Sequence, residues 1–288
     1  IVRGADITLA ADYAHDHEAR IAAGADPVAR RPIAFDLTSA SLAATRTRGR
    51  LRLSANAAVL RYDYRDGLSA AGAVTEQDDR DRTAARLTGR ADYALSPATA
   101  LFFQVARDDR DYRNVRGSPE RSSSGHEALA GMDFELGALI RGEVAVGYIR
   151  QDFQNAAYGD LDGFGGRARL SWFPTQLTTL TAAAGRSVED TGVIGSAGAL
   201  RTDVSISMDH ELLRNLILTA ETAWSEDDYN GLDRTDIRFV ASFSAIYRLN
   251  RRYGLTAGLT YLDQSSSGAA AGPTYRSTRL SIAVVSQF

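Results

Sequence analysis

The sequence contains no cysteine and no lysine, so all 33 of its basic residues are arginine. Without cysteine the chain can form neither disulfides nor thiolate metal sites. It also lacks any run of 18 or more apolar residues, which excludes a transmembrane helix of ordinary length. The formal net charge of -3 gives no reason to expect nucleic acid as a partner. The class of protein must therefore be found in the pattern of the residues that are present.

The chain begins at Ile1 without a methionine or an apolar leader. An exported protein is made with a signal peptide, so we expect either a mature form or a piece whose beginning is missing. The 288 residues are 44% hydrophobic, which is enough for one large domain. We therefore expect residues 1–288 to form a single domain.

Hydrophobicity alternates with a period of two residues rather than 3.6, which indicates β-strands. In the last segment Leu280, Ile282 and Val284 share one face, and Arg279 lies on the other. Many alternating segments continue for ten or more residues, for example 82–95. Soluble strands usually run about 5–6 residues, whereas a tilted transmembrane strand needs about 9–11. Strand length therefore favours segments that cross a membrane.

The connections between these segments alternate between short and long. Short links are expected around 48–49, 96–97, 137–138, 174–175, 213–214 and 250–251. Long polar links are expected at about 63–81, 108–123, 152–162, 189–198, 226–233 and 263–274. Outer-membrane barrels have short periplasmic turns and long outer loops. The pattern predicts an all-β, transmembrane, antiparallel up-and-down β-barrel of about fourteen strands.

The expected strands are centred near fourteen positions, at Leu9, Leu37, Ala57, Thr88, Phe103, Ala130, Val146, Leu170, Ala182, Ile206, Ala220, Phe243, Gly258 and Ile282. The phase of alternation is clear in most of them. It is ambiguous at 38–45 and 178–185, where small residues occupy both faces.

The polar faces of these segments carry charges of both signs, which suits a water-filled lumen. Opposed arginine and carboxylate rows screen permeants by charge, and arginine also binds sugar hydroxyls. The alternative is that these residues pair across strands and brace the wall. The candidate lumen-lining residues are Arg52, Arg86, Arg90, Asp92, Asp133, Glu135, Arg141, Glu143, Arg167, Arg169, Glu221, Arg238 and Arg279.

Aromatic residues gather near both ends of the segments, which predicts two girdles at the membrane interfaces. At the short-turn end they are Tyr93, Trp172, Tyr247, Tyr253 and Phe288. At the long-loop end they are Tyr13, Phe35, Tyr148, Trp224, Tyr261 and Tyr275. The alternative is that aromatic residues are simply common at strand ends. The terminal Phe288 resembles the assembly signal of outer-membrane barrels, which places the short turns in the periplasm and the long loops outside.

Motifs that carry chemistry are few. Residues 15–17, His-Asp-His, lie where barrel proteases hold such groups, but a solvated loop is the simpler interpretation. His126 follows serines too closely for a Ser–His pair, and His210 lacks the second histidine of a zinc motif. Acidic clusters at 76–81 and 226–236 suit Ca²⁺ or ions shared with lipopolysaccharide phosphates, but also simple solvation of loops. We expect no enzymatic activity, no catalytic residue, no metal site and no cofactor.

A series of short motifs runs in order along the chain from about Leu51. They are DRDR at 79–82, RDY at 110–112, GYIRQDF at 147–153, LSWFPTQLTTL at 170–180, RSVE at 186–189, DHELLRN at 209–215 and YRLNR at 247–251. In these motifs the chain resembles the putative β-barrel porin 2 family, outer-membrane proteins often encoded beside capsule and exopolysaccharide export genes. The resemblance implies further strands before the start of this chain, and an intact barrel of about 16 to 18 strands.

We therefore expect a passive conduit for polysaccharide in the outer membrane of a Gram-negative bacterium, working with a periplasmic polysaccharide-export protein. The barrel would contact outer-membrane lipid and lipopolysaccharide. Two alternatives stay open. One is a general diffusion porin for small solutes, which a long loop folded into the lumen would favour. The other is a structural or anchoring barrel for a partner protein or surface layer, which a plugged lumen would favour. The sequence leaves the oligomeric state open.

Overall fold

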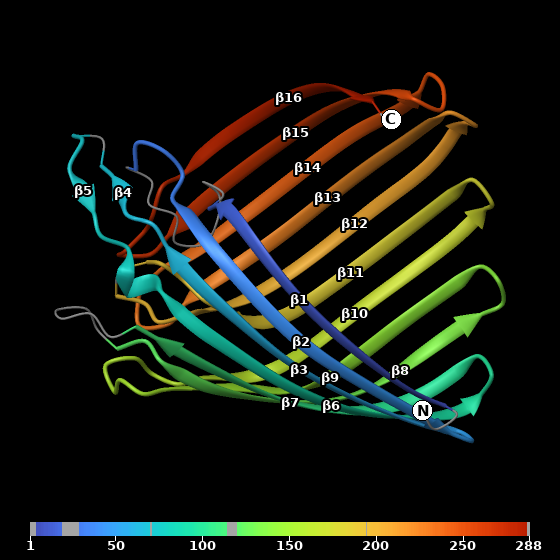
Figure 1. The fold of residues 1–288 in the computed structure, drawn as a ribbon, viewed down its shortest axis with the longest axis horizontal. Coiled ribbons are helices and arrows are strands. Elements are labelled where there is room, and N and C mark those ends of the chain that lie inside the picture. The colour runs from blue at the N-terminus through green and yellow to red at the C-terminus, as the bar shows by residue number, and fades with distance from the viewer. Residues whose placement is uncertain (1–3, 19–28, 70, 114–119, 194, 287–288) are drawn as a thin grey trace.

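The computed structural model describes residues 4–18, 29–69, 71–113, 120–193 and 195–286. In these residues the main element is one antiparallel sheet of fourteen strands (Figure 1). The strands are β1 (Ala5–His17), β2 (Ala34–Arg48), β3 (Leu51–Tyr64), β6 (Arg82–Ser96), β7 (Thr99–Tyr112), β8 (Ser123–Leu136), β9 (Ile140–Phe153), β10 (Leu161–Thr175), β11 (Thr178–Glu189), β12 (Ala199–Leu213), β13 (Leu216–Tyr229), β14 (Thr235–Arg248), β15 (Tyr253–Ser267) and β16 (Tyr275–Ser286).

The connection between β3 and β6 has structure of its own. It holds a small hairpin, β4 (Gly67–Leu68) and β5 (Val74–Thr75), followed by a single 3₁₀ turn, η1 (Asp78–Arg80). Within the described part of the chain, no helix has the length and apolar character that a membrane crossing requires.

Each strand of the large sheet pairs with its neighbours in sequence, so the topology is a simple up-and-down meander. The strands are 12 to 15 residues long, and all fourteen expected centres fall inside them. The predictions of strand number, antiparallel order and strand length are confirmed. Such strands are longer than the usual soluble strand and long enough to cross a bilayer at a tilt.

The two ends of the sheet differ, as the alternating links predict. Short turns join the strands at the right in Figure 1, and long connections join them at the left. Gly49 and Gly137 occupy short turns with φ of 59°, a left-handed conformation that favours glycine. The start of β1 and the end of β16 also lie at the short-turn end (Figure 1).

Some strands run further than expected toward the long connections. Strand β7 continues to Tyr112, β13 to Tyr229 and β15 to Ser267. The expected loop starts at Asp108, Glu226 and Asp263 were therefore wrong. Charged residues remain in the sheet there because their backbone groups still find ladder partners, while their side chains face water or an opposite charge.

The apolar side chains point away from the inside of the curved sheet. Leu87, Phe103 and Val146 are all more than half exposed, and they alternate with polar residues on the other face. The described residues form only small buried apolar clusters, such as Phe102 with Leu129 and Ala145. This distribution is inside-out relative to a soluble β-sandwich and fits a surface that meets lipid.

The sheet is strongly curved (Figure 1), but among the described residues β1 and β16 do not pair with each other. Each of them has a partner on one side only, and residues such as Ile7 on β1 and Leu280 on β16 are about three-quarters exposed. The described wall therefore has two free edges.

Candidate functional site

The strand register places all thirteen expected lumen-lining residues on one face of the sheet. Arg52 pairs with Asp92, Asp92 pairs with Phe102, and the row continues across the sheet to Arg167 and Arg238. Directly paired residues share a face, and residues two apart on a strand share it too. Each of the other expected residues stands an even number of positions along its strand from a member of this row, so it lies on the same face.

This face is the concave one, because its side chains touch across intervening strands. Arg90 on β6 donates to Glu143 on β9 at 2.8 Å, and Arg167 on β10 donates to Gln104 on β7 at 3.1 Å. Two strands separate the members of each pair. Such contacts are possible only where side chains converge on the inner side of a curved sheet.

The central cluster is a network of five expected residues, Arg90, Asp92, Asp133, Glu143 and Arg167. Arg90 donates to all three carboxylates, at 2.7 Å from Nε to Asp92 and 2.8 Å from a terminal nitrogen to Glu143. Glu143 also accepts from Arg167 at 2.6 Å. With three carboxylates and two guanidinium groups, the cluster carries one formal negative charge at neutral pH.

An aromatic ring lies beneath the central cluster. The guanidinium carbon of Arg90 is 3.6 Å from the centroid of the Phe102 ring, and that of Arg167 is 5.8 Å from it. Gly131, directly across from Phe102, leaves room for the ring, since a Cβ there would lie 2.4 Å from it. The result is a rigid surface of stacked ring and guanidinium groups.

A second group, the loop-end cluster, lies on the concave face near the long connections. Asp190, in the β11–β12 connection, pairs with Arg82 at 2.8 Å and with Arg110 at 2.7 Å. Burial raises the pKa of Asp190, but the guanidinium groups of Arg110 and Arg82 outweigh it and lower the pKa. Arg82 also stacks on Tyr62, with its guanidinium carbon 4.1 Å from the ring centroid.

The β3–β6 connection folds over this cluster. Arg80 of η1 is buried, donates to Glu18 at 3.0 Å and stacks on Tyr64 at 4.2 Å. From the β7–β8 connection, Arg121 donates to the Asp79 backbone oxygen and, at 2.9 Å, to the Thr191 backbone oxygen. Three connections that are distant in sequence are thus joined over the inner face.

A cavity of about 420 Å³ lies at this level. Arg82 of β6 and Arg80, which lies just before this strand, line the cavity. Arg201 of β12 and Arg238 of β14 line it as well. It therefore extends across the concave side between strands that are far apart in the sheet.

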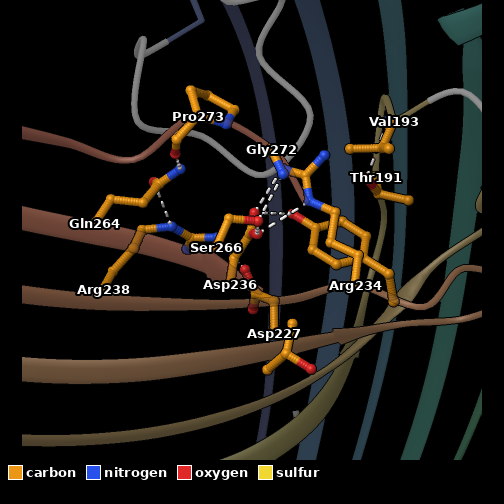
Figure 2. Close-up of polar contacts among 12 residues, drawn as sticks. Thr191, Val193, Asp227, Arg234, Asp236, Arg238, Gln264, Ser266, Gly272 and Pro273 are labelled. Carbon is orange, nitrogen blue, oxygen red and sulfur yellow. Dashed lines mark hydrogen bonds and ion pairs between the residues drawn. The ribbon is translucent and has the colours of Figure 1, made fainter. Parts of the chain in front are cut away.

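The third group surrounds Asp227 and Asp236 on β13 and β14 (Figure 2). Asp227 is fully buried and accepts from Arg201 at 2.7 and 3.0 Å, and also from Arg238. Asp236 is nearly as buried and accepts from Arg234 at 3.0 Å, from the hydroxyl of Tyr229 at 3.0 Å and from Ser266. Both carboxylates belong to the acidic cluster at 226–236, and Asp227 was expected in a loop, but both lie in strands with arginine partners.

The remaining expected residues are less connected. Arg86 donates to Glu127 at 3.1 Å, and Arg141 to Glu135 at 3.3 Å. Four expected residues have no ion pair and no side-chain hydrogen bond within the described part of the chain. They are Arg52, Arg169, Glu221 and Arg279. Arg169 lines a hollow of about 450 Å³ at the short-turn end of β6 to β10, together with Glu135, Arg141 and Glu143.

The girdle residues lie mostly as expected, on the outward face. At the short-turn end these are Tyr93, Trp172, Tyr247 and Tyr253, and at the other end Tyr13, Tyr148, Trp224 and Tyr261. Two placements were wrong. Tyr275 faces inward, opposite Gln264, to which its hydroxyl donates at 3.2 Å, and Phe35 packs inward against Tyr62 and Tyr64. Phe288 lies outside the described residues, and the membrane-interface role of the others stays a prediction.

The histidines belong to strands rather than to loops or turns. His15 and His17 end β1, His126 lies in β8, and His210 lies in β12, where it is 3.0 Å from the hydroxyl of Thr178. Among the described residues, no group of His, Asp or Glu side chains is placed to hold a metal ion. In the 76–81 segment, the acidic side chains of Asp78 and Asp79 pair with Arg113 and Arg121 instead.

Several members of the inner clusters were missed from the sequence. Phe102 and Gln104 lie on the concave face of β7, and Arg82, Arg110 and Arg201 lie beyond the expected lumen set. The missed residues that lie in strands could have been predicted from the alternation of side chains. Phe102, Gln104 and Arg110, for example, are separated by even numbers of residues on one strand and so share a face. Asp190 and Arg121 lie in connections, and no sequence signal places them.

Comparisons with known proteins extend this description. The sequence matches the family described as "Putative beta-barrel porin 2" over residues 1–288. A comparison with curated proteins gave no match. Among solved structures, the FrpB iron transporter of Neisseria meningitidis aligns with a TM-score of 0.56 and 10% identity, over 91% of this chain and 49% of that one.

Two further barrels are similar. The ferric yersiniabactin uptake receptor FyuA of Yersinia pestis has a TM-score of 0.52 and 9% identity, over 94% of this chain and 50% of that one. The siderophore receptor PiuA of Acinetobacter baumannii has a TM-score of 0.51 and 10% identity, over 96% of this chain and 57% of that one. The chain thus spans about half the length of these structures, and the likeness concerns the fold. With the family match over residues 1–288 and an inside-out, up-and-down sheet, the chain belongs to the putative beta-barrel porin 2 family of outer-membrane β-barrels.

Proposed function

We propose that this chain forms the wall of a passive, water-filled conduit for a polysaccharide, delivered by a periplasmic export protein. The observation that supports the proposal best is the inner face, where guanidinium groups lie over aromatic rings at Arg90–Phe102 and Arg82–Tyr62. Sugars present hydroxyl groups and apolar ring faces, and such a surface can meet both. A wall without one dominant charge lets a long hydroxyl-rich chain pass without being held.

The thirteen lumen-lining residues are the proposed permeant contacts. The members without an ion pair or side-chain hydrogen bond to a described residue, which include Arg52 and Arg169, are the most available to a passing sugar. The paired members, such as Arg90 and Glu143, brace the wall and present the stacked surface. Both interpretations of the polar face thus have residues that suit them.

Orientation and size are also part of the proposal. Long connections at one end and short turns at the other support loops outside the cell and turns in the periplasm, where an export protein could dock. The free edges of β1 and β16 support an intact wall with further strands, about 16 to 18 in all.

A second candidate function is diffusion of small solutes. The observation that favours it is the β3–β6 connection, which folds over the concave face and buries Arg80 beside Glu18. A segment of this kind narrows the path and screens solutes by size and charge. A large polymer would require this segment to move aside. We propose neither an enzymatic role nor a metal or cofactor.

The test is single-channel conductance of the intact protein in a planar bilayer, with and without added oligosaccharide. We expect an open conductance that the oligosaccharide blocks reversibly, and weaker block in Phe102→Ala. A matched control is Phe103→Ala, which removes the same ring from the outward face of the same strand.

The other outcomes point elsewhere. Conductance that small ions carry but oligosaccharide does not affect would favour the diffusion porin. A silent barrel would contradict both candidates and favour an anchoring role.

A further inference from the structure

The outward face repeats one arrangement near the long connections. On β1, Tyr13 is followed two residues later by His15, and Asp36 of β2 lies directly across from His15. The side chains at these positions point outward, away from the inner clusters, because they alternate with the concave-face residues.

The same arrangement occurs twice more with arginine. On β9, Tyr148 precedes Arg150 by two residues, and Asp162 of β10 lies directly across from Arg150. On β15, Tyr261 precedes Asp263 by two residues, and Arg276 of β16 lies directly across from it. Each site therefore has a tyrosine, a charged or titratable residue beyond it, and an opposite charge on the neighbouring strand.

In all three sites the tyrosine hydroxyl donates to the aspartate. The distances are 2.8 Å for Tyr13 to Asp36, 2.7 Å for Tyr148 to Asp162 and 3.1 Å for Tyr261 to Asp263. A tyrosine at a membrane interface keeps its ring in the apolar layer and its hydroxyl in the polar layer. The aspartates therefore mark the level at which lipid headgroups begin.

At the first and third sites, the arginine is much more exposed than the carboxylate that holds it. Asp36 pairs with Arg65, whose side chain is 61% exposed while that of Asp36 is 12% exposed. Arg276 is 77% exposed and donates at 2.7 Å to Asp263, which is 29% exposed. Arg150 donates to Asp152 at 2.6 Å and to Asp160 at 3.1 Å, and it is 46% exposed. An approaching headgroup thus meets arginine first at the first and third sites.

The other end of the outward face has no such sites. On the outward face of the fourteen described strands, every Asp and Glu lies in the half nearest the long connections. Near the short turns, the outward charges of β2 are Arg46 and Arg48, and Tyr93, Trp172 and Tyr253 have no carboxylate beside them. The two membrane interfaces of the barrel are therefore chemically different.

We propose that the three tyrosine–aspartate–arginine sites bind the phosphate groups of the lipopolysaccharide in the outer leaflet. Carboxylates orient each arginine, Asp36 and Asp263 at the first and third sites and Asp152 with Asp160 at the second. Arginine binds phosphate through two parallel hydrogen bonds. The inference rests on the proposed orientation with the long connections outside the cell. It does not depend on what passes through the lumen.

The test uses the intact protein in nanodiscs of phosphatidylethanolamine and phosphatidylglycerol doped with lipopolysaccharide. The measurement is the amount of lipopolysaccharide retained per protein after washing. The test variant carries Arg65→Gln, Arg150→Gln and Arg276→Gln. We expect retention to fall by about fivefold for each arginine removed. The matched control carries Arg46→Gln and Arg48→Gln, on the same face at the short-turn end, and should retain lipopolysaccharide as the unmodified protein does.

Three outcomes would overturn the proposal. They are equal retention by the test variant and the unmodified protein, a loss confined to the control variant, and undiminished retention of dephosphorylated lipopolysaccharide. Heat-modifiable migration in gels checks that each variant is folded. Single-channel conductance of the test variant should be unchanged, because its residues lie outside the lumen, so a failure of the conduit proposal would be seen separately.

Discussion

Arginine–aspartate pairs occur on both faces of the wall with almost the same geometry but in different surroundings. On the concave face, Arg201 approaches Asp227 to 2.7 Å, and this carboxylate is 0% exposed. On the outward face, Arg107 approaches Asp109 to 2.8 Å, but the side chains are 59% and 47% exposed. The second pair is open to its surroundings, whereas the first is closed off from water. The comparison teaches that burial, rather than distance, determines what an ion pair contributes.

The strongest test of this comparison removes the buried carboxylate. Asp227→Ala would leave the buried Arg238 and the partly buried Arg201 without their common partner. We expect the free energy of unfolding to fall by about 3–5 kcal/mol, as is typical when one member of a buried pair is removed. Urea unfolding in lipid vesicles measures this change. A loss below about 1 kcal/mol would mean that the concave face is as well hydrated as the outward face.

A smaller but more informative effect is expected at the central cluster. Arg90→Gln would leave three carboxylates, Asp92, Asp133 and Glu143, with Arg167 as the remaining cation of the cluster. We expect about 1–3 kcal/mol of destabilisation and a reversal potential shifted toward cations, because the wall becomes more negative. The measurement is bilayer current under a salt gradient. Arg107→Gln, on the outward face, should leave the potential unchanged, and a shift toward anions in Arg90→Gln would contradict the assignment of this face to the lumen.

A pH experiment tests a buried ion pair that lies outside the membrane-spanning strands. The pKa of Asp190 is lowered by Arg110 and Arg82, so its carboxylate stabilises the folded state above the ordinary aspartate pKa of about 3.9. This contribution is lost as the pH falls through the lowered pKa, where Asp190 becomes protonated. Unfolding measured between neutral and acidic pH should show a shallower loss of stability in Asp190→Asn than in the unmodified protein. An equal slope in both proteins would exclude Asp190 as a source of acid sensitivity.

The smallest effect is expected on the outward face. Asp109→Ala removes an exposed partner of Arg107, which is itself 59% exposed. We expect a change in unfolding free energy within about 0.5 kcal/mol, measured in the same vesicles as for Asp227→Ala. A large loss would show that the surrounding lipid, rather than water, sets the environment of this pair.

Much of the fold follows from local pattern. Side chains alternate across a strand, so Arg90 and Asp92 on β6 could be assigned to the polar face from their spacing alone. Short and long links likewise follow from turn residues such as Gly49 and Gly137. These features depend only on neighbours in sequence.

The contacts within the site could not be predicted in the same way. The bond from Arg90 to Glu143 depends on the register of three successive strand pairs and on the curvature of the sheet. Asp227 looked like a loop residue because acidic runs usually lie in loops, but two arginines hold it in the wall. Tyr275 was assigned to a girdle by residue type, whereas the strand register turns it toward Gln264.

The use of arginine alone has a consequence for how the wall responds to its surroundings. Arginine stays protonated at any pH that a folded protein experiences, whereas lysine can lose its charge when it is buried or in alkali. Among the described residues, the positive half of each ion pair along the inner face is therefore permanent, and within these pairs only the carboxylates titrate. Alkaline conditions leave the charges of these pairs intact, and acid can only make the pairs more positive. In the proposed conduit, the ion pairs of the wall would therefore respond to acid and not to base.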